Sequence, residues 1–180
     1  RGEFPFAHNT LGITETVYPP FLPVMANGDV VDVVCRTYGV GDLGLWKSVK
    51  SLGKELLASP MILRADDERI LKGSPTMAKS TPQAVVYEAT ATDRAVTVKS
   101  TCTTEVDGCM KVELTLAPGT DNAELKSLVL DVPLHDAMMP LWHAVTTVLR
   151  VNPVGAVPPG DGVVWNNNRF SSGQLRINFT

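Results

Sequence analysis

A chain of 180 residues is long enough for one sizeable β-sandwich core and cramped for two domains. Hydrophobic residues make up 44% of it and charged residues 19%, a balance that excludes an intrinsically disordered chain. The formal net charge of −3, with no run of Lys and Arg, excludes a nucleic-acid partner, because phosphate binding requires a basic face. No stretch approaches the ~20 apolar residues of a membrane helix, so we expect no membrane span.

The two ends indicate that the sequence is part of a longer protein. The chain starts at Arg1 without an initiator Met and without a basic-then-apolar signal pattern, and it ends just after a predicted strand at 175–179. We therefore expect a processed or excised piece.

The first half of the chain reads as short strands joined by turns, because two-residue alternation recurs. The β-branched run at 29–38 is predicted as one strand, followed by a glycine-spaced loop at 39–44. Gly53-Lys54 fits a turn, and a second strand is predicted from 56 to 63 with Pro60 at an edge or a strand start.

The strongest local signal is a hairpin at 102–116, where Asp107-Gly108 separates two alternating arms. Before it, 85–89 and 95–101 form a meander around residues 92–94. In the second arm, Lys111, Glu113 and Thr115 are predicted on one face and Val112, Leu114 and Leu116 on the other.

The cysteines are Cys35, Cys102 and Cys109. A two-residue Asp107-Gly108 turn places Cys109 opposite Val106, and Cys102 is then four residues further along, beyond the separation a disulfide tolerates. We predict three free thiols.

The last third is predicted as a strand at 128–134, a short helix running into a strand between 135 and 150, and a Pro/Gly-rich loop from 151 to 168 with a short strand at 163–165. Many short strands with at most one or two short helices predict an all-β fold, a two-sheet antiparallel β-sandwich. No internal repeat or low-complexity tract divides the chain, so one domain over residues 1–180 is expected.

No catalytic constellation stands out. His8, His135 and His143 lack the spacing of a metal site, and no cofactor motif is evident, so we expect neither a metal nor a cofactor. Asp67-Glu68 is an adjacent carboxylate pair, but it stands in the charged turn 66–69 and is expected to be a solvated loop.

The tryptophans are the remaining candidates for a binding site. Trp46, Trp142 and Trp165 lie in or beside predicted loops, and His143 follows Trp142. Each ring could stack on a sugar, plug one end of the sandwich or dock against another domain. We favour docking or plugging, because large aromatic residues are scarce in this chain.

Several short sequence segments occur in a characteristic order: residues 4–6, 18–23, 35–42, 53–60, 105–108, 130–134 and 158–165. This order resembles the N-terminal β-sandwich of large secreted bacterial proteins related to glycoside hydrolase family 123. The resemblance implies an extracellular or periplasmic location and a catalytic barrel domain of the same polypeptide as partner. In that family the barrel carries an adjacent Asp-Glu pair that hydrolyses N-acetylhexosaminides. Asp67-Glu68 falls in the sandwich region, so this role does not transfer to it.

The expected function is that of a non-catalytic accessory domain that packs on a catalytic barrel and contributes to glycan binding. Two alternatives stay open: a free-standing carbohydrate-binding module, and a structural subunit of an extracellular assembly.

Overall fold

The computed structural model describes residues 4, 10, 14–66, 68–121, 123–143, 154–157, 159, 162–166 and 176–179. The chain divides into two compact units, residues 1–133 and 134–180, and each is described by itself. Apart from two 3-10 helices of three residues each, every described element is a strand, which confirms the all-β prediction. The single domain expected over the whole chain stays a prediction.

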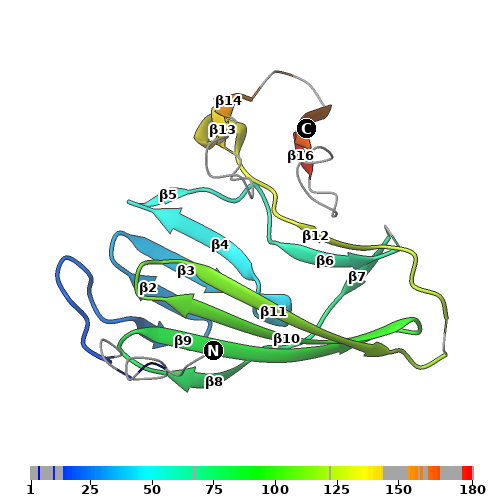
Figure 1. The fold of residues 1–180 in the computed structure, drawn as a ribbon, viewed down its shortest axis with the longest axis horizontal. Coiled ribbons are helices and arrows are strands. Elements are labelled where there is room, and N and C mark those ends of the chain that lie inside the picture. Colours follow the sequence, from blue (N-terminus) through cyan, green and yellow to red (C-terminus); the bar gives the residue numbers. More distant parts are fainter. Residues whose placement is uncertain are drawn as a thin grey trace. The chain divides into compact units, whose positions relative to one another are not determined.

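The first unit contains three antiparallel sheets (Figure 1). The five-stranded sheet has the order β1-β2-β3-β4-β5, the four-stranded sheet β11-β10-β9-β8 and the three-stranded sheet β12-β6-β7. Their bounds are β1 Met25–Asn27, β2 Val30–Val33, β3 Arg36–Val40, β4 Trp46–Ser51, β5 Lys54–Glu55, β6 Ile62–Ala65, β7 Arg69–Leu71, β8 Thr76–Ser80, β9 Ala84–Thr92, β10 Val96–Glu105, β11 Met110–Pro118 and β12 Leu128–Asp131.

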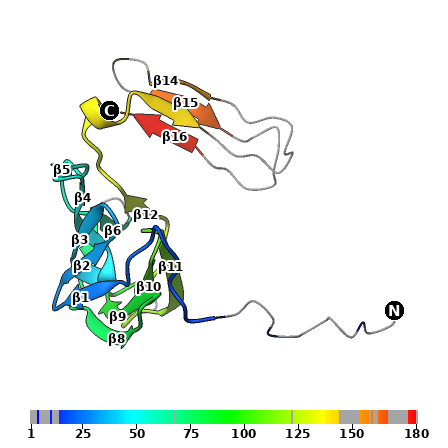
Figure 2. The same ribbon diagram turned by 90° about the vertical axis from the view of Figure 1, so that its left-hand side faces the viewer.

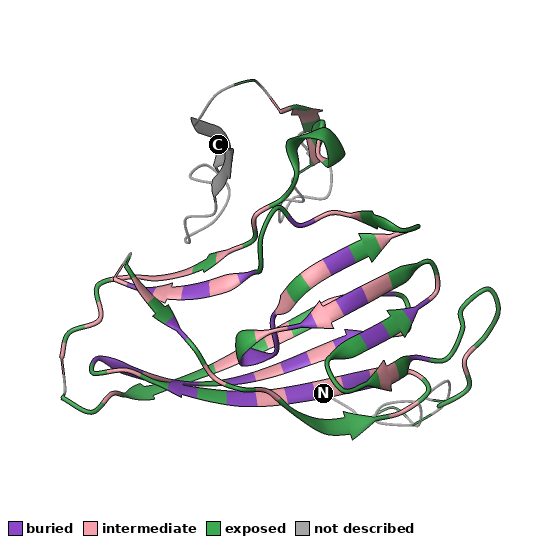
Figure 3. Cartoon of the chain, turned by 180° about the vertical axis from the view of Figure 1, so that it is seen from behind, coloured by how far each residue is buried: buried purple, intermediate pink, exposed green. Residues whose placement is uncertain are grey.

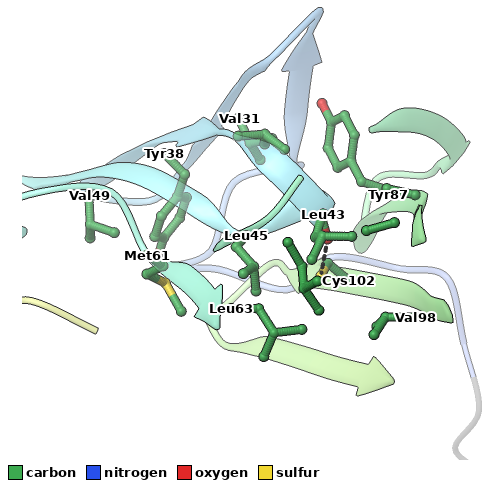
Figure 4. Close-up of a cluster of buried hydrophobic side chains, with 14 of the residues drawn as sticks. Val31, Tyr38, Leu43, Leu45, Val49, Met61, Leu63, Tyr87, Val98 and Cys102 are labelled. Carbon is green, nitrogen blue, oxygen red and sulfur yellow. Dashed lines mark hydrogen bonds between the residues drawn. The ribbon is translucent and has the colours of Figure 1, made fainter. Parts of the chain in front are cut away.

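The core lies between the sheets. Buried residues alternate along the strands, as Figure 3 shows, so each sheet presents one apolar face. Val31 and Tyr38 of the five-stranded sheet, Val98 of the four-stranded sheet and Leu63 of the three-stranded sheet belong to one buried cluster (Figure 4). Full burial of an aliphatic side chain of this size stabilises a fold by about 1.5–3 kcal/mol. The sandwich arrangement follows from this shared core.

A 3-10 turn, η1 (Asp42–Gly44), connects the layers through the core. The Leu43 side chain is fully buried, and its backbone N–H donates to the Gly73 carbonyl at 2.8 Å. The Leu43 carbonyl accepts a hydrogen bond from Cys102 Sγ at 3.3 Å (Figure 4). It accepts another from Ser100 Oγ at 2.7 Å, and both donors lie on β10. The loop predicted at 39–44 is therefore an interior connection between layers.

The strand predicted at 29–38 is in fact a hairpin of β2 and β3. Val33 lies opposite Arg36, so Val34 and Cys35 form the turn, and Cys35 adopts a left-handed φ of +62°. The prediction was wrong because the turn contains no Gly, Asn or Pro, and the β-branched residues continue through it.

The strand predicted from 56 to 63 starts only at Ile62. The preceding turn is Leu52-Gly53, with φ of +49° and +80°, one residue earlier than predicted. The Glu55 carboxylate accepts the backbone N–H groups of Val49, Leu56 and Leu57 at 2.8, 3.2 and 3.1 Å. The Leu56 N–H also donates to the Val49 carbonyl at 2.8 Å, so the carboxylate adds side-chain hydrogen bonds at the point where the β4–β5 pairing ends.

The meander of β9, β10 and β11 is confirmed, but its hairpin loop has three residues. The Glu105 N–H donates to the Cys109 carbonyl at 2.9 Å, so Cys109 lies opposite Glu105 and not Val106, and Gly108 takes a φ of +85°. A three-residue loop with a left-handed glycine is a common hairpin connection, which the Asp-Gly pair alone does not distinguish from a two-residue turn. All three cysteines are free thiols; Cys35 and Cys109 are exposed and Cys102 is buried.

The described residues of the second unit form two antiparallel strand pairs. Its strands are β13 Leu141–His143, β14 Val154–Ala156, β15 Gly162–Asn166 and β16 Arg176–Phe179, with η2 at Asp136–Met138. The predicted helix is a single 3-10 turn that leads into β13, and residues 144–150 of the prediction lie outside the described residues. The strands predicted at 163–165 and 175–179 are confirmed by β15 and β16.

Candidate functional site

Trp46 packs against the core of the first unit. Its ring stacks on Tyr38, with ring centroids 4.3 Å apart and an interplanar angle of 18°, and the Tyr38 ring is 1% exposed. The indole N–H is buried and has no acceptor among the described residues. One face of the Trp46 ring is therefore already covered, which favours the plugging role over a sugar platform at this position.

Tyr38 connects this stack to the tip of the β10–β11 hairpin. Its hydroxyl donates to the Gly108 carbonyl at 2.8 Å, and burial raises the pKa of Tyr38 above its ordinary value. A Cβ on Gly108 would lie 2.4 Å from the Tyr38 hydroxyl oxygen, so only glycine fits. The hairpin tip is fixed by this contact.

Trp142 and His143 lie on β13, in the second unit. Trp142 is half-buried and lies over Gly155, its register partner on β14, where an added Cβ would meet the indole nitrogen at 2.9 Å. His143 points to the opposite face of the hairpin and is exposed, as are Leu141 at 72% and Val154 at 67%. An aromatic ring over a glycine is a known way of stabilising a short strand pair.

The four candidate residues are not brought into one described site. Trp46 belongs to the first unit, and the other three belong to the second. The backbone of Trp165 lies in β15, but its side chain lies outside the described residues, as does His8. The role predicted for this set stays a prediction.

Asp66 and Arg69, the two ends of the charged turn at 66–69, take part in an ion-pair cluster. Arg69 Nη1 lies 3.0 Å from Asp66 Oδ2, and Arg69 Nε lies 2.6 Å from Asp93 Oδ2. Asp66 Oδ1 also accepts the backbone N–H groups of Lys126 and Ser127 at 2.7 and 3.1 Å. Residue spacing within the turn could not reveal this cluster, because Asp93, Lys126 and Ser127 come from two distant segments of the chain. Asp67 lies outside the described residues, and Glu68 is exposed.

Both aspartates of this cluster are held in the charged form. Hydrogen bonds from the backbone N–H groups of Lys126 and Ser127 lower the pKa of Asp66, and a backbone hydrogen bond from Arg94 lowers the pKa of Asp93. A carboxyl with a lowered pKa is a poor general acid near neutral pH. The cluster is therefore suited to a structural role, in which the carboxylates of Asp66 and Asp93 stay charged near neutral pH and pair with Arg69.

Apolar side chains are left exposed at one side of the first unit. Leu116 on β11 is 50% exposed, Leu130 on β12 is 40% exposed, and Val132 just beyond β12 is 44% exposed. We call these three residues the apolar strip. In the part of the chain that the structure describes, no group of three His, Cys, Asp or Glu side chains is arranged to hold a metal ion, and no helix has the length and apolarity to cross a membrane.

Comparison with sequence models of protein families assigns the chain to a family. Residues 24–142 match the sequence model described as glycoside hydrolase 123, third domain. The chain belongs to this family. No curated protein and no solved structure gave a significant match.

The glycoside hydrolase 123 match covers the first unit from just before β1 and extends into β13. It includes Trp46, Trp142, the Asp66 cluster and the apolar strip, whereas His143 and Trp165 lie beyond it. The resemblance read from the sequence is thus confirmed at the level of the family. The family description places this domain third, so an N-terminal position in a longer protein stays a prediction.

Proposed function

We propose that this chain is a non-catalytic accessory domain of a secreted glycoside hydrolase 123 protein and that it packs on the catalytic domain of the same polypeptide. The observation that carries the proposal is the family match, which spans the sandwich and is described as a third domain, a description that implies neighbouring domains. The carboxylates of the Asp66 cluster support it, because they are committed to Arg69 and to backbone N–H groups.

The test compares the isolated 180-residue chain with the multidomain protein that contains it, using an aryl N-acetylhexosaminide as substrate. We expect no hydrolysis by the isolated chain above the uncatalysed rate. Removal of this domain from the multidomain protein should lower the unfolding temperature of the catalytic domain, because a packed apolar interface is lost. Turnover by the isolated chain, abolished by a single carboxylate substitution in it, would contradict the proposal.

Glycan contact is a second role, and Trp142 favours it. This ring is half-buried on a two-stranded hairpin, so part of it remains open to a ligand. Weak glycan binding by the isolated chain that is lost in Trp142→Ala would support this role. An equal signal from wild type and variant would assign any binding to another surface.

A further inference from the structure

The outward face of the four-stranded sheet is largely polar, and that of the five-stranded sheet carries both polar and apolar side chains. Residues on the outward face of the four-stranded sheet include Glu88, Thr90, Lys99, Thr101, Lys111, Glu113 and Thr115, and two ion pairs join members of this set, Lys99 with Glu88 at 3.6 Å and Lys111 with Glu113 at 3.0 Å. Asp32, Thr37 and Lys50 lie on the outward face of the five-stranded sheet, together with the exposed side chains of Met25 and Val30. Such surfaces are compatible with water.

The apolar strip differs because its side chains point toward the core side of their sheets. Leu116 lies opposite Val98, which is fully buried, and Leu130 lies opposite Leu63, which is 2% exposed. Directly opposite residues of paired strands project from the same face. Leu116 and Leu130 are nevertheless half-exposed, because β11 and β12 are edge strands with which no further strand pairs in the described part of the chain.

The two edge strands lie along the same side of the first unit (Figure 2). Leu114 and Leu128 pack against the core cluster. Each lies two residues before a member of the strip, Leu116 or Leu130, and on the same face of its strand. The apolar strip is thus a direct continuation of the core to the surface. Exposed apolar area that is continuous with a core marks a surface that a protein partner covers.

We propose that the apolar strip is the surface on which the catalytic domain of the same polypeptide docks. This inference rests on the proposed function and assigns that function a location. The size of the strip favours this occupant over a second copy of the chain. Three half-exposed aliphatic side chains offer far less area than the roughly 800 Å² per partner of a standard complex between separate proteins.

A covalently linked domain needs much less contact area. The linker keeps the domain at an effective concentration in the millimolar range, so a contact too weak to form between separate molecules can be populated within one chain. The partner surface should be aliphatic or aromatic at its centre. It should also be polar where it meets β12, because Arg64 and Asp131 form an ion pair on the other side of this strand, with 30% and 29% of their side chains exposed.

The test uses the full multidomain protein in four forms: wild type, Leu116→Glu, Val132→Glu and the control Thr115→Glu. Thr115 is exposed on the same strand as Leu116 but faces the polar side, so it matches the change in charge without touching the strip. We expect one coupled thermal transition for wild type and control. In both strip variants the transition of this domain should separate from that of the catalytic domain, and cleavage between the domains by a protease should be roughly tenfold faster.

The isolated 180-residue chain distinguishes a docking effect from a folding defect. Its strip variants should unfold at the same denaturant concentration as wild type, because both substituted side chains are already half-exposed. Coupled unfolding that persists in both strip variants would overturn the inference and leave the proposed function standing. Separate transitions in the wild-type protein would overturn the proposed function itself. A dimer of the isolated chain that either strip variant dissociates would assign the strip to a second copy.

Discussion

Two glycines with nearly the same backbone conformation have very different surroundings. Gly108 has a φ of +85° and Gly53 a φ of +80°, so a side chain is strained at both. Nothing lies within 4 Å of a Cβ built on Gly53, whereas a Cβ on Gly108 would lie 2.4 Å from the Tyr38 hydroxyl oxygen and 2.8 Å from Arg36 Nη1. A substitution at Gly53 therefore tests backbone strain alone, whereas a substitution at Gly108 adds a steric clash.

We expect Gly53→Ala to destabilise the protein by about 1 kcal/mol, the cost of a left-handed alanine. Gly108→Ala should cost roughly 2–4 kcal/mol, because the added methyl group also breaks the Tyr38 contact. Urea denaturation followed by circular dichroism gives both values. Equal losses for the two variants would show that the hairpin tip moves away without breaking its contact with Tyr38.

The buried thiol of Cys102 predicts a pH dependence. Burial raises its pKa from 9.0 to about 11. In the unfolded chain the thiol loses its proton near pH 9, while in the folded protein it keeps the proton, so stability falls as pH rises from 9 to 11. The loss should reach at most roughly 3 kcal/mol.

Chemical denaturation of wild type and Cys102→Ala between pH 7 and 11 checks this expectation. The variant removes the titrating group, so its stability should change less over this interval. Parallel curves for the two proteins would show that other groups cause the alkaline loss. At pH 8, an alkylating reagent should modify Cys35 and Cys109 well before Cys102, which only becomes accessible on unfolding.

At the scale of elements, the Asp66 cluster connects three separate segments between strands. Arg69 at the start of β7 reaches Asp66 in its own turn and Asp93 in the turn between β9 and β10, while Asp66 also holds the segment before β12 through Lys126 and Ser127. The cluster therefore joins the three-stranded sheet to the four-stranded one.

Both aspartates have lowered pKa values, so the stability they contribute is present above the ordinary carboxyl pKa of 3.8 and is lost as the pH falls through the folded value. Arg69→Met should lower the unfolding temperature at pH 7 and make the curve of unfolding temperature against pH flatter below pH 4. Thermal unfolding from pH 2.5 to 7 tests this. Lys72→Met is the control, because Lys72 is an exposed cation near the end of β7.

Elements with clear turn chemistry could be predicted from the sequence, and those without it could not. The meander of β9 to β11 alternates cleanly, and Asp107-Gly108 marks its second turn. The turn at Cys35 carries no such residue, so β2 and β3 merged into one predicted strand. Glu55 shows a second limit, because its carboxylate accepts three backbone N–H groups where β5 ends, and such side-chain hydrogen bonds do not change the local pattern of apolar residues.

The same contrast applies to the candidate site. Tryptophan positions are visible in a sequence, but Trp46 is placed by its stack on Tyr38, which depends on the register of β3 against β4. The apolar strip was equally hidden. Leu116 and Leu130 look like ordinary core positions of alternating strands, and only the strand order shows that they stand at open edges.

For the whole molecule, the protection of backbone amide protons against exchange with deuterium should depend on where each strand lies in its sheet. β10 lies between β9 and β11 and carries fully buried residues such as Val98 and Ser100. We expect the amide protons of β9 and β10 to exchange slowest with deuterium, since their exchange requires opening of the core. Those of β13 and β14 should exchange orders of magnitude faster, because this hairpin has exposed residues on one face. Uniform exchange in all strands would contradict this gradient.

The hydrogen bonds at Leu43 have a consequence for how the two layers are aligned. Apolar side chains attract one another in any lateral position, so packing alone allows the layers to slide by a residue. The bonds from Ser100 and Cys102 to a single carbonyl are directional, and a slide of one residue would leave that carbonyl buried without these donors and the Ser100 hydroxyl with only its 3.4 Å contact to the Ala89 carbonyl of its own sheet. These few polar atoms therefore select one alignment among several of similar apolar energy. Their contribution is to uniqueness of structure more than to its stability.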